Sequence, residues 1–266
     1  MPVVDFFASH SVFSRDEFVH FLKQRGAPSV ETANFHLKRY LAAGRIGRVK
    51  RGVYFSAGPG ETADRSSLDF LLGASRLAPD AVLAYHTALE VHGYAQSLFE
   101  WFYFLTTTKT KPVTFRGRHF VPVLPAAPLR RKKKALTLST EVERRGLPCR
   151  VTTLERTLVD VLDRPDLAGG LEEVWRSLSS VPLFDLNVVV DYVRLCEQAT
   201  LAAKVGFFLE RHQAALGVPR TVLERLRRMR PKQPHYLDRK LGGRMAPGWN
   251  LLVPPNLLGG EAGIDP

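Results

Sequence analysis

The spacing of apolar residues in the first part of the chain predicts three short helices. Residues 3–9 form an apolar-rich segment, and a second helix opens at Ser14, where Glu17 three positions later completes a capping box. A third helix starts at Ser29, directly after a proline, and ends at Gly44. On a wheel of about 100° per residue, the apolar side of this third helix consists of Val30, Ala33, Leu37, Tyr40 and Leu41. Its other side carries Glu31, Thr32, Phe35, His36, Lys38 and Arg39.

A short basic hairpin is predicted after Gly44, in the run RIGRVKRGVYF, with Gly47 and Gly52 supplying turn geometry. Helix, turn, helix and basic hairpin is the order of a winged helix-turn-helix, in which the last helix enters the major groove and the hairpin follows the phosphates. The alternative is a solvated helix pair beside a hairpin whose edge is protected by charge. The order of the elements favours DNA binding.

The predicted DNA-binding residues are Ser29, Thr32, His36, Lys38, Arg39, Arg45, Arg48, Lys50 and Arg51. Of these, we expect Thr32, His36 and Arg39 to reach base edges, and Ser29 and the cations of the hairpin turn to hold phosphates. Phe35 has two interpretations, contact with a thymine methyl group or packing against the first helix. Packing is the favoured one.

A boundary near residue 60 is predicted, because residues 57–66 are rich in Gly, Pro and small polar residues. The fold class is α+β: an N-terminal winged helix-turn-helix, residues 1–60, followed by a mixed α+β domain, residues 61–245, with a small sheet and a helical C-terminal half. Strands are expected at 99–108, 113–124, 136–140 and 148–152, and later helices at 171–180, 185–197, 199–216 and 219–229. Residues 246–266, rich in Pro and Gly, are expected to be an irregular tail.

A helix is also predicted to begin at Thr152, where Glu155 completes a second capping box. Arg156 and Asp160 lie one turn apart on it, and as a surface pair they would contribute only tenths of a kcal/mol. In the preceding region, His86 and His92 are six residues apart and share no helical face, so a structural or capping role is favoured over a metal pair.

The net charge of +12 is unevenly distributed along the chain. Residues 1–58 hold nine basic and four acidic residues, residues 109–134 nine basic and none acidic, and residues 204–244 eleven basic and three acidic. Such segregation favours a polyanionic partner such as double-stranded DNA. Two interpretations stay open for the middle cluster, a second nucleic-acid surface or solvated loops; its members are Arg116, Arg118, Arg130, Arg131, Lys132, Lys133 and Lys134.

Enzyme motifs are missing from the sequence. There is no Walker A, GxGxxG, HExxH or GxSxG pattern, no Asp-x-Asp pair and no Glu-x-Lys, so neither a catalytic residue nor a metal or cofactor site is predicted. The two cysteines are too few for a disulfide framework. With no apolar run of membrane-spanning length and no basic leader, we expect a cytoplasmic protein without a membrane partner.

Several stretches resemble the AbiEi family, antitoxins and autorepressors of bacterial type IV toxin–antitoxin systems that act in abortive infection and phage defence. They are LKRYLAAGRIGRVKRGVYF, AYHTALEVHGYA and, most specifically, VTTLERTLVDVLDRPDLAGGLEEVW. The resemblance runs from about Val12 to about Leu226. It implies an N-terminal domain that represses its own operon by binding operator DNA, and a C-terminal domain needed to counteract a nucleotidyltransferase toxin encoded by the adjacent gene. A winged-helix nuclease with an unrecognised active site is the alternative function.

Overall fold

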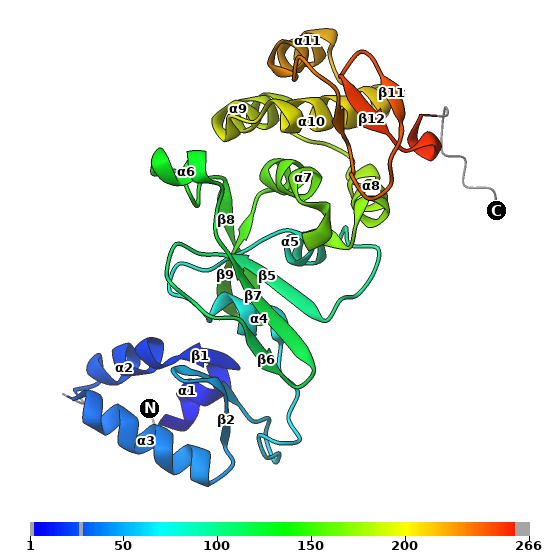
Figure 1. Ribbon diagram of the computed structural model, residues 1–266. Helices are drawn as coiled ribbons and strands as arrows, with labels where there is room; N and C mark the ends of the chain where they lie inside the picture. The colour runs from blue at the N-terminus through cyan, green and yellow to red at the C-terminus, as the bar shows by residue number, and fades with distance from the viewer. Residues whose placement is uncertain (1–2, 27–28, 259–266) are drawn as a thin grey trace. The chain divides into compact units, whose positions relative to one another are not determined.

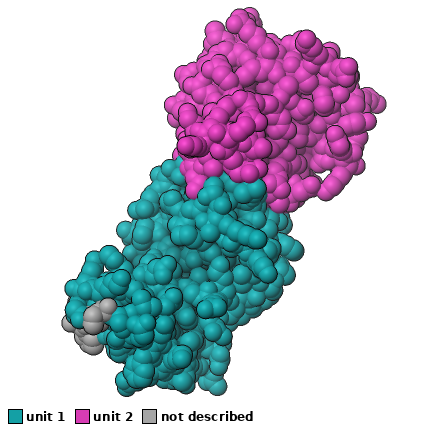
Figure 2. Space-filling model, turned by 60° about the vertical axis from the view of Figure 1, so that its left-hand side comes forward, with its two compact units in different colours: residues 1–87, 99–125, 139–152 teal, residues 88–98, 126–138, 153–266 magenta. Residues whose placement is uncertain are grey.

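The computed structural model describes residues 3–26 and 29–258, which form two compact units. Unit 1 consists of residues 1–87, 99–125 and 139–152, and unit 2 of residues 88–98, 126–138 and 153–266 (Figure 2). Both units contain helices and strands, which confirms the α+β class. Among the described residues, no helix is both long and apolar enough to cross a membrane.

Unit 1 begins with an N-terminal segment, residues 3–26 and 29–56, in which helices pack on a small antiparallel sheet (Figure 1). The strand order within its described residues is β1-β3-β2. The elements are α1 (Val3–Ser9), β1 (Val12–Ser14), α2 (Arg15–Lys23), α3 (Val30–Ala42), β2 (Ile46–Lys50) and β3 (Val53–Ser56). The predicted helices are thus confirmed, and strand β1 is an addition.

An aromatic core fixes α3 in this segment. Phe6, Phe13 and Phe18 are almost fully buried, and the rings of Phe6 and Phe18 have centroids 5.1 Å apart. Ala33 and Leu37 of α3 pack into the same cluster. Local caps support the helices, as predicted: Ser14 and Glu17 form the capping box of α2, and the Ser29 side chain accepts a hydrogen bond from the Thr32 amide. Ser29 is therefore the N-cap of α3.

The rest of unit 1 is a mixed sheet with strand order β6-β7-β5-β4-β9-β8 among the described residues. Its elements are α4 (Phe70–Ser75), β4 (Val82–Leu83), the first turn of α5 (His86–His92), β5 (Trp101–Leu105), β6 (Val113–Phe115), β7 (Arg118–Val123), β8 (Ser139–Arg144) and β9 (Leu147–Thr152). The single strand predicted at 113–124 is a hairpin instead. Arg116 and Gly117 both adopt positive φ at its turn, a geometry that reverses the chain.

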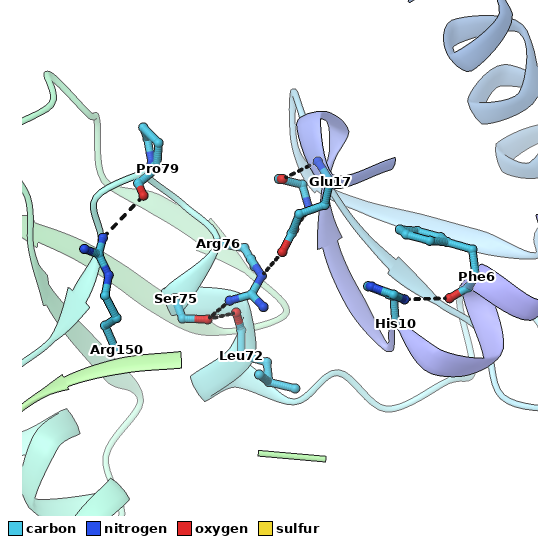
Figure 3. Close-up of polar contacts among 9 residues, drawn as sticks. Phe6, His10, Glu17, Leu72, Ser75, Arg76, Pro79 and Arg150 are labelled. Atoms are coloured by element: carbon cyan, nitrogen blue, oxygen red, sulfur yellow. Dashed lines mark hydrogen bonds and ion pairs between the residues drawn. The ribbon is translucent and has the colours of Figure 1, made fainter. Parts of the chain in front are cut away.

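Polar contacts attach the N-terminal segment to the rest of unit 1 (Figure 3). Arg76 Nε lies 2.9 Å from Glu17 Oε1, and the Lys50 ammonium donates to the Leu77 carbonyl oxygen at 2.6 Å. Arg116 donates to the carbonyl oxygens of Ala63 and Ser66. The residues predicted as an interdomain linker, 57–66, therefore lie within unit 1 and are bound to its sheet.

Unit 2 is mainly helical. Its helices are the later part of α5, α6 (Ala127–Arg131), α7 (Leu154–Asp163), a 3₁₀ turn (Pro165–Ala168), α8 (Leu171–Ser179), α9 (Leu186–Cys196), α10 (Ala199–Arg211) and α11 (Arg220–Met229). The bounds of α8 to α11 follow the predicted ones, except that α10 ends five residues early. Helix α7 has a different cap from the one predicted: Thr153, not Thr152, accepts the hydrogen bond, from the Arg156 amide, because Thr152 is the last residue of β9.

Arg156 is buried, which corrects the prediction of a surface ion pair. Its side chain is 1% exposed. The guanidinium contacts Asp160 at 3.1 Å, donates to the carbonyl oxygens of Thr137 and Ala135, and lies over the Tyr192 ring. Tyr192 in turn donates to Asp160 at 2.9 Å. A buried pair satisfied in this way costs far more to break than a solvated one.

The expectation of an irregular tail after residue 245 is wrong for the described residues. Strands β10 (His235–Tyr236), β12 (Leu251–Val253) and β11 (Arg244–Ala246) form a small sheet, and a 3₁₀ turn follows (Pro255–Leu257). Trp249 is 1% exposed, packs against Gly206 and donates to Glu210 at 2.7 Å. The Pro and Gly content predicted irregular structure, but the buried Trp249 anchors the segment to α10. Residues 259–266 lie outside the described residues.

Replacing Arg156 with Met should lower the free energy of unfolding by about 3 to 5 kcal/mol, because Asp160 loses its cationic partner and the carbonyl oxygens of Ala135 and Thr137 lose a donor. Urea unfolding followed by circular dichroism measures the change. Arg176→Met is the matched control, since its i,i+4 pair with Glu172 is exposed, and it should change stability by less than about 0.5 kcal/mol. Equal effects of the two substitutions would contradict the structural role.

Replacing Lys50 with Met should destabilise the chain by about 1 kcal/mol, because the apolar stem is kept while the Leu77 carbonyl loses its donor. Lys38→Met, at an exposed position of the same segment, is the control and should have little effect. The same unfolding measurement applies. If the Lys50 variant were as stable as the control, the hydrogen bond from Lys50 to the Leu77 carbonyl would not contribute to the stability of the chain.

Candidate nucleic-acid interface

The outward side of α3 differs in part from the predicted one. Lys38 and Arg39 are exposed, as expected for residues that contact a ligand. Phe35 is 63% exposed and has a ring contact with His36 beside it, so the expectation that Phe35 packs against the first helix is wrong. The reason lies in the wheel: Ala33 and Leu37 take the buried side, and Phe35 falls opposite both.

The other predicted residues of α3 are less accessible. Ser29 caps the helix, and the Thr32 hydroxyl lies 3.2 Å from the Ser29 hydroxyl. His36 is half-buried beside Tyr40, and its Nδ1 atom has no hydrogen-bond partner among the described residues. Arg39 is therefore the most accessible of the three residues expected to read base edges.

The β2–β3 hairpin presents two of its three predicted cations to solvent. Arg48 and Arg51 are exposed, and so is Arg45 in the turn between α3 and β2. Lys50 instead points to Leu77, and burial lowers the pKa of its ammonium group. The role of phosphate ligand predicted for Lys50 thus competes with an internal hydrogen bond. Gly52 sits at the turn with φ +86°, a conformation that favours glycine, and Gly47 leaves room for the Phe55 ring.

An open groove of about 910 Å³ lies between α3 and this turn. Its walls carry Lys38, Arg48 and Arg51 together with Arg15 and Asn34. Sequence reasoning missed the last two; Arg15 Nε donates to Asn34 Oδ1 at 3.0 Å, which joins α2 to α3. Asn34 lies four residues before Lys38 on α3, and this spacing could have indicated that the two side chains share one side of the helix. Chemically, a groove with several exposed cations suits an anionic backbone better than an apolar ligand.

The second predicted basic surface is divided between the units. Arg116 and Arg118 belong to unit 1, whereas Arg130, Arg131, Lys132, Lys133 and Lys134 belong to unit 2. Arg116 binds backbone carbonyls, and Arg118 lies 3.4 Å from Glu100. Arg131 and Lys132 both pair with Glu197 at 2.6 Å, an interaction that lowers the pKa of this carboxyl group. Arg116, Arg118, Arg131 and Lys132 therefore have internal partners, and the carboxylates of Glu100 and Glu197 offset part of the charge of this cluster.

His86 and the two cysteines, whose side chains could take part in chemistry, are buried. His86 is buried and its ring packs edge-on against Phe99. Both cysteines are buried and unbonded, and burial raises the pKa of Cys196 to about 12. Among residues 3–26 and 29–258, no group of three or more His, Cys, Asp or Glu side chains is arranged to hold a metal ion.

Comparison with known proteins gives a fold but no family. No protein-family model matches the chain, and no curated protein matches it. Among solved structures, the chain is similar to the crystal structure of the RV2827C protein from Mycobacterium tuberculosis, with a TM-score of 0.58 and 16% sequence identity. The match covers 94% of this chain and 89% of that one. At this identity the likeness establishes a shared fold and nothing about activity.

Proposed function

We propose that this chain is a transcriptional repressor that binds double-stranded operator DNA through its N-terminal segment, which acts as a winged helix-turn-helix. The groove between α3 and the β2–β3 turn carries the proposal, because Lys38, Arg48 and Arg51 surround it and Arg39 is exposed beside them. Helix α3 would enter the major groove, while the hairpin turn would follow the phosphate backbone.

Three features support this assignment over a merely solvated helix pair. Strand β2 of the basic hairpin packs against α3 and is joined to it by a short turn. The aromatic core holds α3 with its cations outward. The exposed Arg48 lies on strand β2 and the exposed Arg51 in the tight β2–β3 turn, so both present charge on a short, defined hairpin rather than on a long loop.

We further propose, from the AbiEi resemblance, that the repressed operon encodes a nucleotidyltransferase toxin and that this chain counteracts it. The stretch that carries the resemblance most specifically runs from the end of β9 through α7 and the 3₁₀ turn into α8, and Arg156 and Asp160 of α7 lie in a buried network. Those residues would then maintain the fold of unit 2, and the residues that counteract the toxin would lie on its surface.

Operator binding is tested with the DNA upstream of the gene for this chain, in fluorescence anisotropy titrations at several salt concentrations. Arg39→Ala should weaken binding by about 1 to 3 kcal/mol and relax sequence preference. Arg48→Ala and Arg51→Ala should each weaken binding to all DNA sequences alike. Each should also make the slope of log K against log salt concentration shallower by about one, since each removes one phosphate contact. Arg194→Ala, an exposed arginine of unit 2, is the control. An Arg39, Arg48, Arg51 triple alanine variant that bound normally would refute the interface.

Separation of the two activities is tested in cells that express the neighbouring toxin from an independent promoter. The triple alanine variant should lose repression of an operon reporter but keep the ability to rescue growth, because its substitutions are confined to exposed positions of the N-terminal segment. Arg156→Met should lose both activities through unfolding. Loss of rescue by the triple variant, at normal protein levels, would argue that DNA binding itself protects the cell.

A further inference from the structure

Phe35 occupies the centre of the outward side of α3. At about 100° per residue it lies about 180° from the midpoint between Ala33 and Leu37, the two residues that bury this helix. Its side chain is 63% exposed, and its ring contact within the described residues is with His36, at 5.9 Å between centroids. An aromatic side chain exposed to this extent gains little from the fold, and most of its apolar surface stays in water.

The residues around Phe35 indicate the chemical character of a partner that would cover its ring. Lys38 and Arg39, three and four residues on, lie on the same exposed surface of the helix. Glu31, one turn before Phe35, is also exposed, so the two cations lie on the C-terminal side of the ring. A partner that covers Phe35 and meets these cations combines an apolar group with negative charge on that side. The major groove of DNA has this combination, because the C5 methyl group of thymine projects into it between the phosphate backbones.

We propose that Phe35 contacts the C5 methyl group of a thymine and so makes the operator specific for that base at one position. This inference rests on the proposed DNA-binding function. The rise of a helix separates Phe35 from Arg39 by about 6 Å along its axis, about two base steps. The base that Arg39 reads is accordingly expected within about two base pairs of that thymine.

The test uses the full chain and operator duplexes in which each thymine is replaced in turn by deoxyuridine, which lacks only the methyl group. For the wild-type protein, one replacement should weaken binding about fourfold, which corresponds to ~0.8 kcal/mol for one buried methyl group. For Phe35→Ala, binding should be weaker on the natural duplex and insensitive to that replacement. Phe35→Leu should retain part of the sensitivity. This double-mutant cycle isolates the contact.

Leu183→Ala, which truncates another exposed apolar side chain in unit 2, is the control and should leave binding unchanged. Because Phe35 is exposed, its alanine variant should fold with an unchanged circular dichroism spectrum and melting temperature. A Phe35→Ala variant that kept the full sensitivity to deoxyuridine would overturn the inference. So would a loss of self-association in sedimentation velocity with DNA binding intact, since Phe35 would then face a second copy of the chain. Failure of the wild-type protein to bind any duplex would refute the DNA-binding function instead.

Discussion

The burial of Ala33 and Leu37 against the aromatic core is the constraint on which the proposed interface depends. These two residues fix the rotation of α3, and the rotation decides which side chains meet solvent. Phe35, Lys38 and Arg39 are outside because of it. A different rotation would bury a cation, which carries a large desolvation cost, so the apolar residues and the charges favour the same orientation. The core thus sets the geometry of the surface.

A second consequence of the fold is the division of the cations into two groups. Lys50, Arg116 and Arg156 all donate to backbone carbonyl oxygens, and each joins segments that are distant in sequence. Arg48 and Arg51 remain exposed beside the groove. Net charge is therefore a poor guide to binding strength in this protein. The salt dependence of the proposed DNA binding should reflect the exposed group, because only exposed cations can displace counterions from DNA.

Much of the secondary structure could be predicted from sequence, since caps and amphipathic periods are local signals. The capping box of Ser14 and Glu17 has both partners within one helical turn, and the bounds of α8 and α9 follow from apolar spacing. The misassignments share a cause. Strand β1 is only three residues long, and the segment around Trp249 is ordered by contacts with α10, so neither carries a strong local pattern.

For the candidate site, the sequence by itself determined the order of helices and hairpin, the caps of α2 and α3 and the presence of a basic cluster. These follow from interactions between neighbours in the chain. Only the tertiary structure decided that Arg156 is buried, that Lys50 is held by Leu77 and that Phe35 faces solvent. Thr137 and Ala135 lie about twenty residues from Arg156, and Leu77 lies 27 residues from Lys50. Exposure is set by such distant partners, and a local pattern of residue types cannot encode where they will be.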